Sequence, residues 1–191
     1  MAPVILNQSI NENADFIRQV GLESGQPVQQ CYQCGKCTAG CPAASFMDYA
    51  PHQVIHLVQL GLEEEVLSCR AIWVCASCQT CTARCPCRIE VARIMDLLRA
   101  RARRKGLHRG QRAALFADLF LDSVRRHGRL HELELGVRWG LRTGQPWREA
   151  DLAAGLVARR KLLLRPPRIK GVEEVRRIFR EAARLEEGEH G

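Results

Sequence analysis

The sequence predicts an all-α protein, and two observations lead to this fold class. Apolar residues recur three and four positions apart along several segments, which is the spacing of an amphipathic helix. No segment alternates between apolar and polar residues over a useful length, so we expect no strands. The 191 residues suffice for a small domain with an extension, and we divide them into regions 1–30, 31–106 and 107–191.

Region 1–30 is a polar lead-in for which we expect one short helix. In "NENADFIRQVG", the apolar side chains of Phe16, Ile17 and Val20 share one face. Gly21 follows them directly, and glycine is the residue most often found just after a helix end. The pattern therefore predicts a helix that stops at Gly21.

Region 31–106 contains an internal repeat, in which each copy is a four-cysteine loop followed by an amphipathic helix. In the first copy the helix begins at Pro51 and ends at Gly61, with Val54, Ile55, Leu57 and Val58 as its apolar face. In the second copy the apolar face is Val91, Ile94, Met95 and Leu98, and the helix runs through "RARARRKG" to Gly106. A further short helix is expected over 62–68.

Region 107–191 has no cysteine and is expected to be a helical extension that docks a partner. One predicted helix ends before Gly128 and carries the stripe Leu115, Phe116, Leu119, Phe120 and Val124. A second begins at the N-cap candidate Asp151 and is followed by the linker "RPPRIKG". The last has Val172, Val175, Ile178 and Phe179 on one face, and the acidic end "LEEGEHG" is expected to fray.

Eight of the ten cysteines lie in two matching stretches, "CYQCGKCTAGCP" at 31–42 and "CASCQTCTARCP" at 75–86. Both have the spacing C-x2-C-x2-C-x3-C-P, in which three thiolates wrap one cubane cluster and the fourth binds the other cluster. This predicts two [4Fe-4S] clusters on an all-helical version of the two-cluster ferredoxin arrangement. One cluster has Cys31, Cys34, Cys37 and Cys85 as ligands, and the other has Cys75, Cys78, Cys81 and Cys41.

Zinc is the alternative for these cysteines. A zinc ribbon needs two C-x2-C pairs and leaves the third cysteine and the Cys-Pro of each stretch unexplained. A zinc-stabilised, basic nucleic-acid-binding module is therefore the weakest hypothesis. The tract "RARARRKG" lacks interleaved aromatic residues, so we predict no nucleic-acid partner. It is interpreted as a solvated helix face, with a docking surface for an acidic partner as the alternative. The net charge of +8 is in part a counter-charge for the clusters.

The remaining candidates for chemistry are interpreted as structural. Cys69 and Cys87 are expected to be free thiols, with a redox switch or a third site as the alternative. Cys87 could replace Cys85 as a ligand, but Cys85 has the Cys-Pro context. The histidines His52, His56 and His108 are expected to be partly exposed rather than ligands, and Trp73 to pack beside a cluster.

Other features exclude a substrate site and point to the cytoplasm. No G-x-G-x-x-G follows a strand, so no flavin or NAD site is expected on this chain, and there is no nucleophile elbow or carboxylate cluster. No signal peptide is visible, and no apolar run approaches the roughly 20 residues that span a bilayer. Two redox centres without catalytic residues describe an electron carrier.

Both cysteine stretches, the helix between them and "PPRIKGVEEVRRIF" resemble the C-type iron–sulfur subunit of heterodisulfide reductase, from about residue 5 to 182. The resemblance implies a relay of single electrons between an A-type subunit, which carries flavin, and a B-type subunit, which cleaves a disulfide with CCG-motif clusters. Hydrogenase or other electron-input subunits are further candidate partners. The cysteine motif also occurs in glycolate oxidase and fumarate reductase, so an iron–sulfur subunit of such a dehydrogenase is the alternative.

Overall fold

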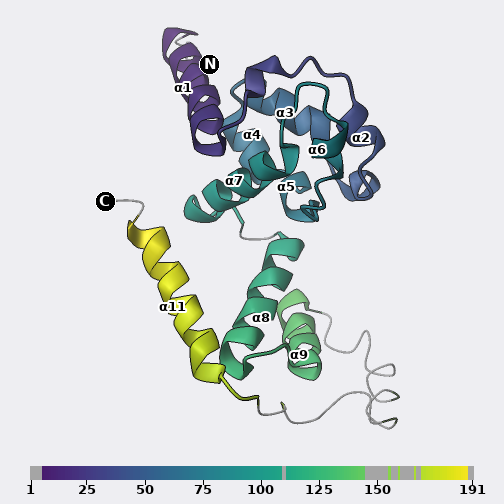
Figure 1. Cartoon of the computed structure of the whole chain (residues 1–191), viewed down its shortest axis with the longest axis vertical. Coiled ribbons are helices and arrows are strands. Elements are labelled where there is room, and N and C mark those ends of the chain that lie inside the picture. The colour runs from purple at the N-terminus through teal and green to yellow at the C-terminus, as the bar shows by residue number, and fades with distance from the viewer. Residues whose placement is uncertain are drawn as a thin grey trace. The chain divides into compact units, whose positions relative to one another are not determined.

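The computed structural model describes residues 6–108, 111–144 and 169–188, together with residues 155, 159 and 166. The chain divides into two compact units, Met1–Ala113 and Ala114–Gly191. Within the described ranges every regular element is helical, which confirms the predicted all-α class (Figure 1). None of the helices in these ranges is long and apolar enough to cross a membrane.

Unit 1 is built from short helices and two 3-10 turns. In chain order they are α1 (Leu6–Ser24), η1 (Val28–Gln30), α2 (Lys36–Ala39), η2 (Ala44–Phe46), α3 (Pro51–Gln59), α4 (Glu63–Ser68), α5 (Ala71–Val74), α6 (Thr80–Arg84) and α7 (Val91–Arg104). The predicted ends at Gly61 and Gly106 are confirmed, since both glycines take the left-handed conformation there.

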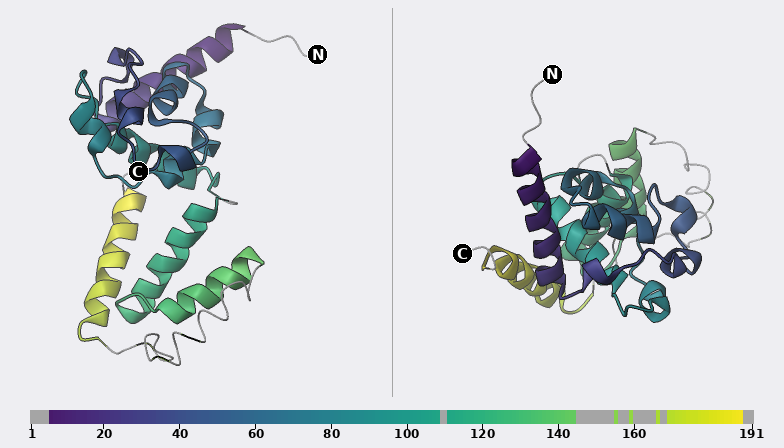
Figure 2. Two further views of the ribbon diagram at one scale, coloured as in Figure 1. Left: turned by 90° about the vertical axis from the view of Figure 1, so that its right-hand side faces the viewer. Right: turned by 90° about the horizontal axis from the view of Figure 1, so that it is seen from above.

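The core of unit 1 forms around α7, which packs against α1, α4, α5 and α6 (Figures 1 and 2). The apolar faces predicted for α3 and α7 are buried in this core, except that Leu57 is only half-buried. Fully buried side chains from four helices meet there: Val54, Ile55 and Val58 of α3, Val66 and Leu67 of α4, Ile72 of α5, and Ile94, Met95 and Leu98 of α7.

Helix α1 is longer than predicted, because Gly21 lies inside it. The helix continues to Ser24, and Gly25 takes the left-handed conformation at its end. Ser24 is buried, and its hydroxyl donates to the carbonyl of Val20 at 2.5 Å. The burial of Val20 and Ser24, one on each side of Gly21, outweighs the weak helix preference of one glycine.

The interpretation of "RARARRKG" as a solvated face is wrong at Arg101. This side chain is buried, its guanidinium donates to Glu23 at 2.5 Å and to Gln19 at 3.2 Å, and it lies over the ring of Phe16. The cause is tertiary, since α1 packs across α7 and brings a carboxylate to the arginine.

Unit 2 contains α8 (Arg112–His127), α9 (Glu132–Thr143) and α11 (Val172–Gly188), where α8 begins at the end of unit 1. The predicted stop at Gly128 is confirmed, whereas α9 was not predicted as a separate helix. Helices α8 and α11 meet near Gly128, where a side chain would collide with Ile169, and they diverge from there (Figures 1 and 2). Helix α11 is assigned as far as Gly188, while Asp151 and the last residues of the expected frayed end, 189–191, lie outside the described residues.

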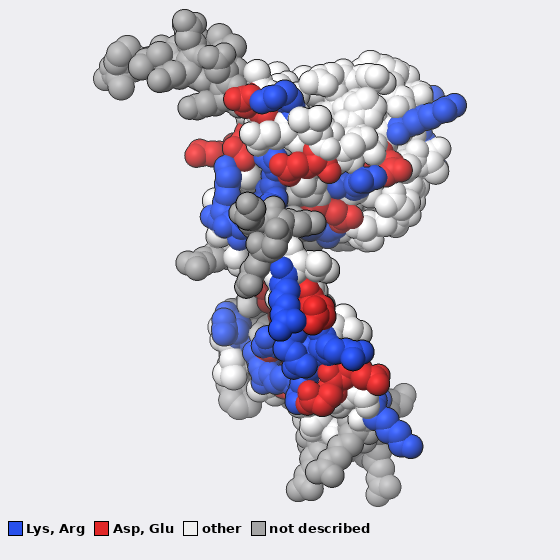
Figure 3. All heavy atoms as spheres, turned by 60° about the vertical axis from the view of Figure 1, so that its left-hand side comes forward, with Lys and Arg blue, Asp and Glu red and all other residues white. Residues whose placement is uncertain are grey.

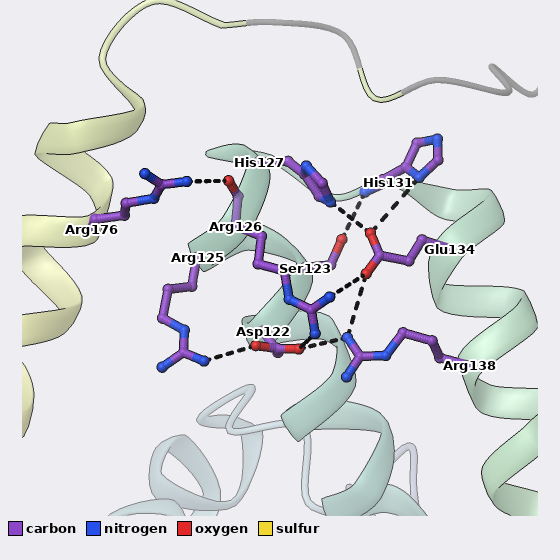
Figure 4. Close-up of polar contacts among 9 residues, drawn as sticks. All are labelled: Asp122, Ser123, Arg125, Arg126, His127, His131, Glu134, Arg138 and Arg176. Carbon is purple, nitrogen blue, oxygen red and sulfur yellow. Dashed lines mark hydrogen bonds and ion pairs between the residues drawn. The ribbon is translucent and has the colours of Figure 1, made fainter.

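Ion pairs connect α8 to α9 (Figure 4). Asp122 accepts hydrogen bonds from three arginines, at 2.9 Å from Arg125 and 2.5 Å from Arg138, and from Arg126. The carboxylate of Glu134 in α9 accepts a hydrogen bond from Arg126 at 3.1 Å and lies 2.6 Å from Nε2 of His127. By contrast, large apolar side chains of unit 2 are exposed: Phe116, Phe120, Leu121, Val137, Leu141, Ile178 and Leu185.

Candidate iron–sulfur centres

The two cysteine loops repeat each other in backbone conformation as well as in sequence. Cys31 and Cys75 are 44 positions apart, and the same offset relates the left-handed residues Gln33 (φ 59°) and Ser77 (φ 49°). It also relates Gly35 (φ 74°) to Gln79 (φ 61°). Left-handed non-glycine residues cost on the order of 1–3 kcal/mol each and persist only where the surroundings hold them. The repeated strain indicates that both loops serve the same purpose.

Each loop, with one cysteine of the other, lines a cavity. The first cavity, which we name the Cys31 cavity, is lined by Cys31, Cys34, Cys37 and Cys85. The second, the Cys75 cavity, is lined by Cys41, Cys75, Cys78 and Cys81. Helices α2 and α6, which contain Cys37 and Cys81, pack against each other. The fold thus groups the eight cysteines in the same two sets as the motif spacing.

The walls between the sulfurs are largely apolar. Ile55, Pro86, Ile89 and Val91 complete the Cys31 cavity together with His52 and Gly35. Pro42, Met47, Val91, Ala92 and Met95 are among the residues that complete the Cys75 cavity. Val91 lies in both walls, at the start of α7. An apolar wall excludes water from a thiolate cluster and influences its reduction potential.

Hydrogen-bond donors reach several of the sulfurs. The amide of Ile89 donates to Cys85 Sγ at 3.3 Å, and the side chain of Gln33 donates to Cys31 Sγ at 3.4 Å. The hydroxyl of Thr80 lies 3.4 Å from Cys78 Sγ. Such donors stabilise thiolates and cluster sulfurs.

Burial and hydrogen bonds act in opposite directions on these thiols. Burial raises the pKa of Cys31, Cys37 and Cys75 above the ordinary thiol value. The hydroxyl and amide of Thr80 lower the pKa of Cys78, which is exposed. A buried thiol that is reluctant to ionise in water becomes a thiolate when a metal replaces its proton.

These residues fit [4Fe-4S] clusters. Four thiols surround each cavity, soft thiolates are the ligands that iron–sulfur clusters take, and donors aim at the sulfurs. Among the described residues, no three His, Cys, Asp or Glu side chains are arranged to hold a single metal ion. Each set of four cysteines lines one cavity, as the four ligands of a cubane must.

The other candidates from the sequence lie outside the cysteine sets. Cys69 is buried and Cys87 is half-buried, and neither lines the Cys31 cavity or the Cys75 cavity; the thiol of Cys87 donates to the carbonyl of Gln30 at 3.1 Å. His56 is exposed, whereas His52 lines the Cys31 cavity with Nδ1 at 2.7 Å from the hydroxyl of Thr38. Trp73 lines neither cavity.

Trp73 packs instead on α7 and on the segment that follows it. The guanidinium of Arg103 lies 5.4 Å from its ring centre, and the ring of His108 lies 6.5 Å away. Its position beside a cluster was predicted from its place two residues before Cys75. The short helix α5 turns it away into the core of unit 1, where it is 8% exposed.

Two residues that hold the cysteine loops were not predicted. Gln59, at the end of α3, donates to the carbonyls of Cys31 at 2.9 Å and of Val28 at 3.1 Å. Arg99 of α7 donates to the carbonyl of Cys75 at 3.2 Å and to Ser77 Oγ at 2.7 Å. The repeat could have predicted their equivalence, since Gln59 and Arg99 each stand eight positions after the first residue of their helix.

Comparisons with known proteins agree with this geometry. Residues 27–89 match the family model of the 4Fe-4S dicluster domain, a stretch that holds all eight motif cysteines. The C-type subunit of an H2:CoB-CoM heterodisulfide,ferredoxin reductase from Methanothermobacter thermautotrophicus is 31% identical over 50% of this chain and 52% of its own length. The C-type iron–sulfur subunit of the CoB–CoM heterodisulfide reductase from Methanopyrus kandleri is 38% identical over 49% of this chain and 53% of its own length.

A third relative shows the same extent of similarity. The second C-type iron–sulfur subunit of the CoB–CoM heterodisulfide reductase from Methanocaldococcus jannaschii is 36% identical over 54% of this chain and 58% of its own length. The chain therefore spans about half the length of the curated relatives it matches. Over that half, its resemblance to the C-type subunit of heterodisulfide reductase is confirmed.

Proposed function

We propose that this chain is the electron-transfer subunit of a heterodisulfide reductase-like complex and relays single electrons through two [4Fe-4S] clusters. The observation that carries the proposal is the grouping of the eight motif cysteines around two cavities within the residues that match the dicluster domain. The relatives named as C-type subunits of heterodisulfide reductases support the choice of complex.

Cys31, Cys34, Cys37 and Cys85 would hold one cluster, and Cys41, Cys75, Cys78 and Cys81 the other. A bound [4Fe-4S] cluster supplies one-electron chemistry without a change in its ligands. The residues of the chain do the rest: the apolar walls exclude water, and Gln59 and Arg99 fix the loops through their carbonyls. The crossed ligands Cys41 and Cys85 keep the two sites in one small body.

The partners in this proposal are a flavin-carrying A-type subunit and a disulfide-cleaving B-type subunit with CCG motifs. Hydrogenase or another electron-input protein completes the path of electron transfer, and the compartment is the cytoplasm, where thiols stay reduced. The exposed thiols Cys34 and Cys78 mark one point of access to each set. Unit 2, with its exposed apolar side chains, is the surface we assign to docking.

The test is anaerobic copurification followed by reconstitution of electron transfer. We expect a CCG-motif protein and a flavoprotein to copurify with the chain. In that complex, Cys34→Ala and Cys78→Ala should each stop electron transfer to the disulfide while the partner's flavin remains reducible. Cys87→Ala is the matched control and should have no effect, because Cys87 lines neither cavity.

Two results would contradict the proposal. Recovery of a covalent-flavin dehydrogenase as the partner would indicate the glycolate oxidase or fumarate reductase type of complex. Unchanged electron transfer in both cysteine variants would exclude a relay through this chain.

A further inference from the structure

The two cysteine loops are held by equivalent side chains of opposite electrical character, and this difference bears on the proposed clusters. Helix α7 repeats α3 at an offset of 40, from Pro51 to Val91. The same offset relates the cavity-lining residues Ile55 and Met95, and it relates Gln59 to Arg99.

Gln59 and Arg99 make the same contacts in their own copies. Each donates to the carbonyl of the first motif cysteine, at 2.9 Å for Cys31 and 3.2 Å for Cys75. Each also binds the side chain of the residue two positions later, Gln33 at 3.0 Å and Ser77 at 2.7 Å. Both loops are therefore anchored alike, but one anchor is neutral and the other carries a full positive charge.

The charge on Arg99 is placed where solvent screens it only in part. Its side chain is 25% exposed, whereas Asp96, with which it forms an ion pair, is 52% exposed. Its guanidinium donates to the carbonyl of Cys75, whereas the carboxylate of Asp96 accepts from the hydroxyl of Ser77. The positive charge is therefore the more buried of the pair and the one that contacts a proposed cluster ligand.

The cations close to the Cys31 cavity in sequence are placed differently. Lys36 and Arg84 adjoin motif cysteines, and Arg88 adjoins the cavity-lining Ile89, but all three are exposed, so water and salt screen them. His52 lines this cavity, and its ring is engaged with Thr38.

We propose that Arg99 makes the cluster of the Cys75 cavity easier to reduce than the cluster of the Cys31 cavity. The inference rests on the proposed function, because it requires both clusters. Reduction adds one electron and therefore one negative charge, and a partly buried cation nearby stabilises that charge. An electron leaving the Cys31 set oxidises that cluster and reduces the other, with no proton or further reactant involved. At equilibrium the electron then resides on the Arg99 side.

The test is a redox titration of the whole holo-chain, followed by electron paramagnetic resonance at pH 8.5, where ordinary imidazoles carry no charge. Signals are assigned with the Cys34→Ala and Cys78→Ala proteins. Arg99→Gln copies the natural anchor Gln59 and should retain the cluster. We expect it to lower the ratio of reduced to oxidised cluster in the Cys75 cavity about tenfold, or about 59 mV for one electron.

Asp96→Asn removes the opposing charge, and we expect a shift of the same cluster in the opposite direction. Arg99→Lys keeps the charge with a different donor geometry and should stay close to wild type. Arg93→Gln is the matched control, since it removes an arginine from the same helix that is 57% exposed, and should shift neither cluster. A purely structural role of Arg99 would not produce opposite shifts in two variants.

The outcomes separate this inference from the proposed function. A wild-type chain that binds no [4Fe-4S] clusters overturns the proposed function. Two clusters whose potentials stay unchanged in both Arg99→Gln and Asp96→Asn overturn the role of Arg99 and leave the proposed function standing. If Arg99→Gln loses its cluster, the Asp96→Asn and Arg99→Lys proteins decide the question.

Discussion

The two units of the chain are stabilised by different means. Unit 1 buries apolar side chains of α3, α4, α5 and α7 in one core, and Gln59 and Arg99 anchor its cysteine loops. Unit 2 joins α8 to α9 through the ion pairs of Asp122 and Glu134, and the largest fully buried side chains all lie in unit 1, although both units expose large apolar side chains. Figure 3 shows arginines and lysines gathered over the helices of unit 2, and a wide uncharged area on unit 1. The comparison shows that unit 1 depends mainly on apolar burial and that unit 2 depends more on ion pairs.

The largest loss of stability should come from a substitution that shortens a buried side chain in the core of unit 1. Leu98→Ala removes a fully buried side chain of α7 and should lower the free energy of unfolding by about 2–5 kcal/mol. The matched control in unit 2 is Leu121→Ala, whose side chain is 47% exposed, and it should cost less than about 0.5 kcal/mol. Anaerobic denaturant unfolding measures both, and equal costs would remove the distinction between the units.

The next largest loss of stability should follow from removing the charge of Asp122, which pairs with three arginines in unit 2. Asp122→Asn weakens the contacts with three arginines and should cost about 2 kcal/mol, with a loss of helical circular dichroism. Glu181→Gln, which breaks one exposed pair with Arg184, is the control and should have no measurable effect. High salt should reduce the difference between wild type and Asp122→Asn, because it screens the pairs.

The same carboxylate predicts how unit 2 responds to acid. Burial alone would raise the pKa of Asp122, but the hydrogen bonds from Arg126, Arg138 and Arg125 outweigh it and lower the pKa well below the ordinary value. A lowered folded-state pKa means stability that is complete above about pH 4 and is lost as the pH falls further. Acid titration followed by circular dichroism should therefore show a loss in wild type that is smaller in Asp122→Asn.

A smaller effect is expected at a helix cap of unit 1. Asp48 accepts from the amides of Arg70 at 2.6 Å and Ala71 at 2.7 Å, at the start of α5. Removing such a cap in Asp48→Ala should cost about 1 kcal/mol in chemical denaturation. Asp48→Asn retains an acceptor oxygen and should cost less; an equal loss in both variants would indicate that the negative charge matters more than the cap.

The last prediction concerns the alkylation rates of Cys69 and Cys87, the two cysteines that belong to neither cluster set. Burial raises the pKa of Cys69 to about 11, so its thiolate is scarce at pH 8. In the folded holo-chain, alkylation of Cys69 should be on the order of a hundredfold slower than that of an ordinary exposed thiol. Peptide mass spectrometry after timed labelling compares it with the half-buried Cys87, and rapid labelling of Cys69 would show that unit 1 opens locally.

Local signals predicted much of unit 1. The spacing of the cysteines predicted which four of them line each cavity. Glycines predicted the ends of α3 and α7, because a left-handed residue after a helix is a local requirement. The burial of Arg101 and the extension of α1 past Gly21 were missed, because both depend on how α1 packs across α7. Gln59 and Arg99 could have been found by aligning the two helices rather than the two loops.

The central claim is that the chain holds two [4Fe-4S] clusters in its two cysteine-lined cavities. The most direct measurement is iron and acid-labile sulfide per chain in anaerobically purified protein, with visible and electron paramagnetic resonance spectra of the reduced state. We predict about eight irons and eight sulfides, and about half of each in Cys34→Ala and in Cys78→Ala. A colourless protein that contains zinc, or iron that is unaffected by both substitutions, would contradict the claim.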